Sequence, residues 1–240
     1  MTKHKVGVIG CGVVGGLLVD HFRFKGNPVL RRDPKHGWFD SMKHAEAVFI
    51  CIPVPTDSEG AQDIDVLKAE IDAVKEVTDA PIFVRSTVLP GCCDTLGVYA
   101  MPEFITERTK NEDFVAHPIY VGGHRDFIKT LFPRHVVTQL TNVECEIGKF
   151  AHNCFGALKV SYFNMIHEFC ELMEVKYRNV QDVVLGSGYI SPVHTKVPGP
   201  DGKRGYGGKC FPDNMKAFKK IIPILDEAYR YNTKVRKRPS

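Results

Sequence analysis

The sequence predicts an α/β protein in which a trimmed parallel sheet is followed by a helical domain. Short apolar runs bounded by glycine and proline alternate with helical spacing up to residue 141. A glycine-rich turn joins the first apolar run to the first helical segment. From residue 142 to about 175 the spacing is helical and no proline interrupts it. We therefore expect two domains, residues 1–141 and residues 142–240.

The composition is ordinary for a globular protein and excludes several classes of function. Of 240 residues, 43% are hydrophobic and 25% are charged, and no apolar run is long enough to span a membrane. The net charge of +4 favours an anionic ligand but is too mild to predict nucleic-acid binding. The eight cysteines show no zinc-binding spacing, so we expect no metal. Their scatter and the lack of a signal-peptide core predict a cytoplasmic protein.

The first element is predicted to be a buried parallel strand at residues 5–9, and a helix is predicted at residues 13–24. The turn between them fits the pattern G-x-G-x-x-G, with glycines at positions 10, 12 and 15. In such a turn Gly10 permits the tight bend and Gly12 lets the backbone approach a pyrophosphate, while Gly15 lets helix and strand pack closely. The helix N-terminus, with Val13 and Val14, then faces the phosphates.

A second strand is predicted at residues 28–32, and Asp33 follows it, 18 positions after Gly15 (33 − 15 = 18). At this spacing a carboxylate can bond the ribose hydroxyls of a dinucleotide, which predicts a Rossmann-type domain. Because a carboxylate repels a 2′-phosphate, Asp33 favours NAD over NADP, although Arg31 and Arg32 moderate this preference. Only about a dozen residues separate Asp33 from the next apolar run, which is too short for a helix and a strand.

Polar loops are predicted to follow the next strands at the sheet edge where open α/β sheets bind ligands. Pro53 to Thr56 follow the apolar run 47–52, Thr87 follows a predicted strand at residues 82–85, and Glu103 lies in a similar position further on. The other elements expected in this half are a helix at residues 64–77, strands at residues 119–121 and 136–139, and a short helix from residue 125.

The helical half places a lysine, an asparagine and a cysteine in informative positions. Lys149 and Asn153 are four residues apart on the first helix and share one face. A second helix is expected from residue 179 to residue 185, then a Gly- and Pro-rich loop at 186–208, and a last helix at 213–231. Cys210 follows Gly205-Tyr206-Gly207-Gly208-Lys209, where glycines leave room for a substrate. Backbone N–H groups and the charge of Lys209 would stabilise a thiolate there.

These residues together resemble the UDP-glucose/GDP-mannose dehydrogenase family. The resemblance rests on the glycine turn, the Pro53–Thr56 loop, the Ser-Thr-Val loop at Thr87, the Pro-Glu-Phe element at Glu103, the Lys149–Asn153 helix and the G-[FY]-G-G-x-C-F-P box. It implies oxidation of a nucleotide-sugar C6 alcohol to the carboxylate with two NAD per turnover, a UDP-glucose 6-dehydrogenase-like activity. It also implies a homodimer, formed through a helical dimerisation domain.

The resemblance implies a role for each matched residue. Cys210 would be the nucleophile that forms a thiohemiacetal and then a thioester. Lys149 and Asn153 would steady the oxyanion, and Thr87, Glu103 and Glu107 would position or activate a water. The predicted cofactor-binding residues are Gly10, Gly12, Val13, Val14, Gly15, Asp33, Pro53, Thr56 and Thr87. The predicted substrate-binding residues are Phe104, Ile105, Lys149, Asn153, Tyr206, Gly207 and Gly208.

Three departures from the family pattern keep other functions open. The family has an aspartate where this chain has Asn214, and Asp213 is the candidate substitute, one residue earlier. The family's arginine-bearing loop is not matched at residues 186–191, and a C-terminal UDP-binding domain would begin where this chain stops, so we expect a short form. The alternatives are a two-electron hydroxyacid-type dehydrogenase and a non-catalytic NAD-binding protein derived from the family.

Overall fold

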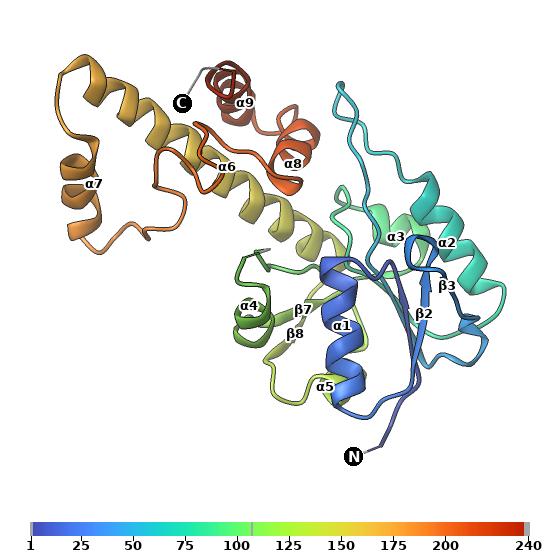
Figure 1. Cartoon of the computed structure of the whole chain (residues 1–240). Coiled ribbons are helices and arrows are strands. Elements are labelled where there is room, and N and C mark those ends of the chain that lie inside the picture. The colour runs from blue at the N-terminus through green and yellow to red at the C-terminus, as the bar shows by residue number, and fades with distance from the viewer. Residues whose placement is uncertain (1, 107, 238–240) are drawn as a thin grey trace. The chain divides into compact units, whose positions relative to one another are not determined.

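The computed structural model describes residues 2–106 and 108–237, and its contacts divide the chain into two compact units (Figure 1). Unit 1 comprises Met1–Pro55 and Gln62–Lys149, and unit 2 comprises Thr56–Ala61 and Phe150–Ser240. The division falls inside helix α6 (Asn142–Leu172), after Lys149. The sequence placed a domain boundary earlier, between residues 141 and 142.

A six-stranded sheet forms the centre of unit 1 in the order β3-β2-β1-β4-β5-β6. The strands are β1 (Val6–Ile9), β2 (Val29–Asp33), β3 (Trp38–Phe39), β4 (Ala47–Ile50), β5 (Ile82–Val84) and β6 (Tyr99–Ala100). All neighbouring pairs are parallel except β2 and β3. Every residue of β1 and β4 is buried, because helices cover both faces of a parallel sheet. This confirms the predicted fold class.

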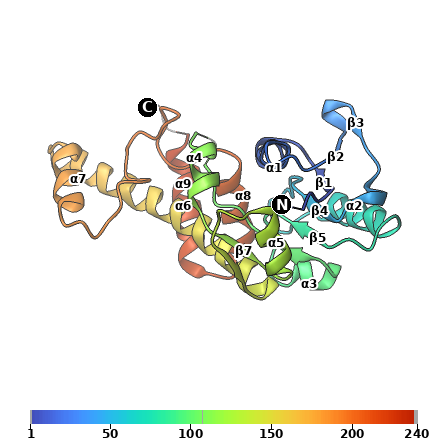
Figure 2. The same cartoon turned by 90° about the horizontal axis from the view of Figure 1, so that it is seen from below.

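Helices α1 (Val13–Phe24) and α2 (Asp65–Lys75) lie on opposite faces of this sheet (Figure 2). Leu18 and Phe22 of α1 pack in one apolar cluster with Phe49 of β4. Ile71 of α2 packs in the other cluster with Val48. Since Val48 and Phe49 are neighbours on one strand, their side chains point to opposite faces, and each face buries a separate apolar stripe.

The segment between β2 and β4 is trimmed, as the sequence predicted. It holds two 3₁₀ turns, Pro34–His36 and Met42–His44, and the two-residue strand β3, with no α-helix. Asp33 accepts a hydrogen bond from the Lys35 N–H and so caps the first turn. Gly37 then adopts φ = +69°, which reverses the chain so that Trp38 pairs with Asp33.

The remainder of unit 1 contains two helices that the sequence did not predict. Helix α3 (Cys92–Leu96) has five residues, and helix α4 (Lys110–Ala116) buries none of its residues. Such short or unburied helices carry no apolar period that a pattern could detect. The predicted strands β7 (Ile119–Val121) and β8 (Val137–Gln139) form a separate parallel pair, and helix α5 (Arg125–Leu131) connects them.

Unit 2 is helical, with α7 (Tyr177–Gly186), α8 (Cys210–Phe218) and α9 (Pro223–Val235) beside most of α6. The prediction of one last helix at residues 213–231 was wrong, since the chain forms two helices there. Pro223 lacks a backbone N–H and occupies the first turn of α9, so α8 cannot continue through it. Phe150 of α6 stacks on Phe218 of α8, with ring centroids 4.7 Å apart.

Two further properties bear on function. Among the helices of the described residues, none combines the length and the apolar character that a bilayer span requires. In residues 2–106 and 108–237, no three His, Cys, Asp or Glu side chains gather as a potential metal site.

The close contact between α1 and the glycine turn should contribute to the stability of unit 1. A Cβ on Gly15 would overlap the carbonyl oxygen of Gly10. We expect Gly15→Ala to lower the free energy of unfolding by about 1–3 kcal/mol or more, as overpacking does. Urea denaturation followed by circular dichroism measures this change.

The neighbouring glycine supplies the control. A Cβ on Gly16 would lie 3.5 Å from the carbonyl oxygen of Cys11, an ordinary contact. Gly16→Ala should therefore be neutral or stabilise the helix by about 0.5–1 kcal/mol. Equal destabilisation by both substitutions would contradict the proposed close approach at Gly15.

Candidate active site

The glycine turn of unit 1 leaves open space at the N-terminus of α1. Gly10 has φ = +80°, and a Cβ there would lie 2.8 Å from the Cys51 carbonyl oxygen. A Cβ on Gly12 would meet nothing within 4 Å. No side chain caps α1, and its first turn, which includes Val13 and Val14, carries no acidic residue. These features fit a pyrophosphate bound by backbone N–H groups.

Asp33 lies beside this turn, at the end of β2, as its spacing predicted. Its Oδ2 accepts a hydrogen bond from the Cys11 N–H at 2.7 Å and lies 3.0 Å from His36 Nδ1. Burial alone would raise the pKa of Asp33, but hydrogen bonds from Cys11, His36 and Lys35 outweigh it and hold the pKa below its usual value. Asp33 is therefore ionised at neutral pH. Its contact with ribose hydroxyls stays a prediction.

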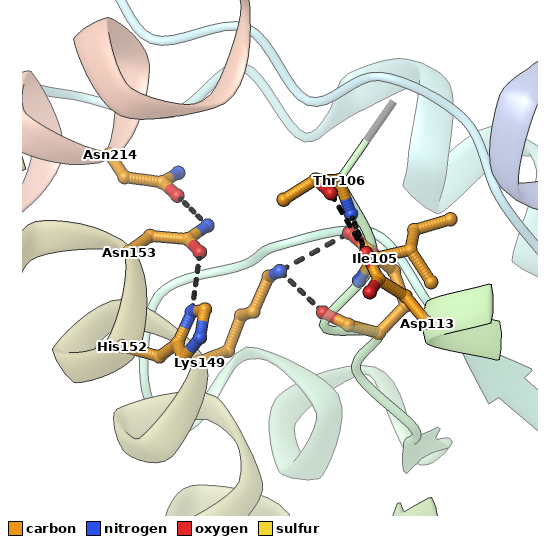
Figure 3. A network of polar contacts seen from close by, with 8 residues as sticks. Ile105, Thr106, Asp113, Lys149, His152, Asn153 and Asn214 are labelled. Atoms are coloured by element: carbon orange, nitrogen blue, oxygen red, sulfur yellow. Dashed lines mark hydrogen bonds and ion pairs between the residues drawn. The ribbon is translucent and has the colours of Figure 1, made fainter. Parts of the chain in front are cut away.

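The candidate catalytic residues Lys149 and Glu103 form a buried pair in unit 1. The ammonium of Lys149 donates to the carbonyl oxygen of Glu103 and lies 3.2 Å from its Oε1 (Figure 3). The two side chains are only 4% and 10% exposed. The other carboxylate oxygen accepts from the Ile105 N–H at 2.7 Å, and Lys149 Nζ lies 5.2 Å from the centroid of the Phe104 ring. The structure thus brings four predicted site residues together.

Thr87 lies next to this pair. It lines a small pocket with Lys149, Pro102 and buried Glu146. Its carbonyl oxygen accepts from the side chain of Gln62 at 3.0 Å, and the Gln62 carbonyl oxygen accepts from the Leu89 N–H at 2.7 Å. Gln62 therefore fixes the loop that carries Thr87. No sequence pattern pointed to Gln62, because both partners lie far away in the chain.

The remaining predicted loop residues do not all belong to unit 1. Pro53 belongs to unit 1, but Thr56 belongs to unit 2. Thr56 is buried, and its hydroxyl has no hydrogen-bond partner, although it was predicted to bind the cofactor. Glu107 lies outside the described residues.

In unit 2, Asn153 of α6 meets Asn214 of α8. Asn153 Nδ2 donates to Asn214 Oδ1 at 2.6 Å, and both side chains are buried (Figure 3). The Asn153 Oδ1 lies 3.0 Å from His152 Nδ1. Asp213 instead pairs with Lys216 at 3.3 Å on the partly exposed side of α8. Because one residue along a helix turns the side chain by about 100°, Asp213 and Asn214 point in different directions, and the catalytic role of Asp213 stays a prediction.

Cys210 is the first residue of α8 and follows Gly208, which has φ = +78° and no atom within 4 Å of a Cβ position. All eight cysteines lie in the described residues, and Cys210 alone is exposed. Burial raises the pKa of the Cys154 thiol to about 12 and that of the Cys51 thiol to about 12. Cys210 is thus the most exposed of the eight thiols, and its role as nucleophile stays a prediction.

The glycine box before Cys210 is anchored by asparagines that the sequence did not single out. Asn232 of α9 accepts from the Tyr206 N–H at 2.7 Å and donates to the Tyr206 carbonyl oxygen at 3.1 Å. Asn164 of α6 accepts from the Gly205 N–H at 3.0 Å. Tyr206 is 3% exposed, and burial raises its pKa, so it anchors the loop, and its burial does not favour the predicted substrate contact. Gly207 lies against the Arg236 guanidinium.

Comparison with known proteins matches both halves of the chain to one family. The model of the UDP-glucose/GDP-mannose dehydrogenase family, NAD binding domain, matches residues 37–134, and the central-domain model matches residues 143–238. A UDP-glucose 6-dehydrogenase of Rickettsia typhi is 28% identical over 229 residues, which are 82% of this chain and 49% of that protein. A UDP-glucose 6-dehydrogenase of Rickettsia felis is 27% identical over 210 residues, 76% of this chain and 45% of that protein.

Solved structures show the same fold. A UDP-glucose dehydrogenase from Pyrobaculum islandicum has a TM-score of 0.85 at 22% identity and covers 97% of this chain and 68% of its own. A GDP-mannose dehydrogenase from Pseudomonas aeruginosa has a TM-score of 0.68 at 19% identity, with 96% and 68% covered. The chain spans about half the length of the curated relatives it matches.

Removing one side chain of the buried Lys149–Glu103 pair should lower the stability of the protein. Lys149→Met leaves a buried carboxylate without its cation, and we expect a loss of about 3–5 kcal/mol in the free energy of unfolding. Adding Glu103→Leu should recover a large part of that loss, because no unpaired charge then remains. Urea denaturation of the two single variants and the double variant measures the coupling.

A surface lysine is the matched control. Lys68 pairs with Asp72 in water on α2, so Lys68→Met should change stability little. Additive losses in the Lys149 and Glu103 variants would mean that the two side chains do not interact.

Proposed function

Because the chain belongs to the UDP-glucose/GDP-mannose dehydrogenase family, we propose that it oxidises the C6 alcohol of a nucleotide sugar to the carboxylate, using NAD and a cysteine thioester. The observation that carries this proposal is the position of Cys210. An exposed thiol begins a helix two residues after the open glycine Gly208, while the other seven cysteines are buried or partly buried. A helix N-terminus favours the thiolate, which is the nucleophilic form.

NAD is the cofactor, because the family's NAD-binding domain matches this chain. When bound, this cofactor would supply the hydride acceptor for the two oxidations. The chain would hold its pyrophosphate at Gly12 and the N-terminus of α1, where a side chain is absent. Asp33, ionised beside the same turn, would orient the adenosine ribose.

The proposed cysteine chemistry balances in three steps. After the first two-electron oxidation, the Cys210 thiolate adds to the carbonyl carbon of the aldehyde and gives a thiohemiacetal. A second two-electron oxidation converts the C–H of that adduct into a thioester. Water then adds to the thioester carbonyl, releases the carboxylic acid and returns the thiol. Two cofactor molecules are therefore reduced for each sugar.

Lys149 and Asn153 are the proposed donors to the oxyanions of this sequence. They lie four residues apart on α6, so both face the same side of that helix. Asn153 uses one N–H for Asn214 and keeps the second. One such donor is worth roughly 3 kcal/mol in the transition state. Glu103, held by Lys149, and Thr87 would position the hydrolytic water.

The exposed face of α6 supports a homodimer as part of the proposal. Phe155, Tyr162 and Phe169 follow one another at intervals of seven residues (162 − 155 = 7) and are 65%, 55% and 58% exposed. Seven residues are close to two helical turns, so the three rings form one apolar stripe. Such a stripe is unusual on a monomer's surface and suits a contact with a second copy of the chain.

One observation favours a second candidate, an NAD-binding protein without turnover. Asn214 cannot accept a proton as an aspartate would, and Asp213 points to Lys216 instead. Loss of this group would slow the step that needs a base. This candidate shares the cofactor site and differs from the first in requiring no function of Cys210.

Substitution of Cys210 tests the proposed chemistry. Wild-type protein incubated with NAD and a panel of UDP- and GDP-sugars should form two NADH for each sugar consumed, measured by absorbance and chromatography. Cys210→Ala should abolish acid formation, and mass spectrometry should detect a sugar adduct on Cys210 in the wild type alone. Cys92→Ala, which removes a half-buried thiol, should keep the ratio of two. A ratio of one would support the hydroxyacid-type reaction, and a fully active Cys210→Ala variant would exclude the thioester.

Position 214 tests the second candidate. Asn214→Asp places a carboxylate against Asn153 and should raise the rate of acid formation by about 10²-fold, the lower range for a general base. Asp213→Asn should leave the rate unchanged, because Asp213 pairs with Lys216. Binding of NAD with no turnover in either the wild type or the Asn214→Asp variant would favour the non-catalytic candidate.

A further inference from the structure

A cluster of charged and aromatic side chains surrounds Asp33 in the trimmed segment of unit 1. The ring of His36 stacks on Trp38, with centroids 4.8 Å apart and planes 17° from parallel. The guanidinium of Arg31 lies 4.1 Å from the centroid of the same indole ring. His36 Nδ1 lies 3.0 Å from Asp33 Oδ2. The sequence singled out Asp33 and Arg31 but not their contacts with His36 and Trp38, because the short hairpin of β2 and β3 creates these contacts.

Three donors already occupy the carboxylate of Asp33. The Cys11 N–H and His36 share Oδ2, and the Lys35 N–H bonds Oδ1. A carboxylate offers about four lone-pair positions, so about one remains. The adenosine ribose of NAD brings two hydroxyl donors. Since the other two donors are backbone groups, the half-exposed His36 is the one that can move aside.

The carboxylate of Asp33 alone would repel a 2′-phosphate, but the positive charge of Arg31 offsets this repulsion. Arg31 lies over Trp38, and its buried Nε has no hydrogen-bond partner. Its charge reaches the glycine turn: the pKa of the Cys11 thiol is raised to about 11, chiefly by burial and then by Asp33, while Arg31 acts in the opposite direction. Arg32 is not part of this balance, because it pairs with Glu70 of α2 at 3.0 Å.

We propose that His36 is a specificity-determining residue of the NAD site. Held on Trp38, its imidazole takes one position on Asp33 from the ribose hydroxyls of NAD, and together with Arg31 it offers donors to a 2′-phosphate. The chain therefore discriminates weakly between NAD and NADP. This inference rests on the cofactor site of the proposed function but on none of its chemistry.

Cofactor binding tests the proposal without turnover. Trp38 is the single tryptophan of the chain, so titration of its fluorescence with NAD⁺ or NADP⁺ reports this site directly, and calorimetry gives the same dissociation constants independently. For the wild type we expect the two constants to lie within about tenfold of each other. His36→Ala should tighten NAD⁺ and weaken NADP⁺, so that their ratio widens by about tenfold or more.

His44→Ala is the matched control, since it removes an exposed histidine from the next 3₁₀ turn. It should leave both constants unchanged. A wild-type preference for NAD⁺ above about 10³-fold, or an unchanged ratio in His36→Ala, overturns the role of His36 while NAD binding stands. Failure to bind either dinucleotide would instead contradict the cofactor site itself.

Discussion

The buried polar side chains at the start of α6 are the constraint on which unit 1 depends. Asn142 bonds the Ala100 N–H and the Val98 carbonyl oxygen, and Glu146 accepts from the N–H groups of Gly91 and Cys93. One turn further on, Lys149 reaches Glu103. Burying any of these polar groups without its partner would cost free energy, whereas burying it within its pair costs little. The start of α6 therefore packs against these loops in one position. That position sets the ammonium beside the loops of Thr87 and Glu103.

In unit 2, asparagine side chains fix the position of a loop in the same way. The segment before Cys210 contains no helix or strand, so its backbone N–H and C=O groups need other partners. Asn164 and Asn232 supply them at Gly205 and Tyr206, from two different helices. A glycine-rich loop is flexible by composition, yet these bonds fix its end where α8 begins. The exposed thiol of Cys210 is thereby held at the first residue of α8, directly after a segment with a defined conformation.

The sequence predicted those elements that depend on residue spacing within a single segment. The glycine turn, the strands β1 and β4 and the helix α6 follow from spacing within one segment. The break before Pro223 was missed although the proline was visible, because the apolar spacing on both sides continues through it. Gln62 and Asn232 could not be found, since their partners are 25 or more residues away. Whether Asp213 or Asn214 faces Asn153 depends on the residue at which α8 begins, and only the structure shows that residue.

The Asn153–Asn214 pair separates orientation from proton transfer. The proposed role of Asn153 as an oxyanion donor requires an N–H with a fixed direction. The amide of Asn153 has a fixed orientation because it is bonded at both ends, to His152 and to Asn214. A carboxylate at position 214 would accept the same N–H, with charge assistance. The amide therefore keeps the geometry that the family's aspartate would impose and removes only its basicity. We therefore expect an asparagine at position 214 to leave the site ordered and to change proton transfer alone.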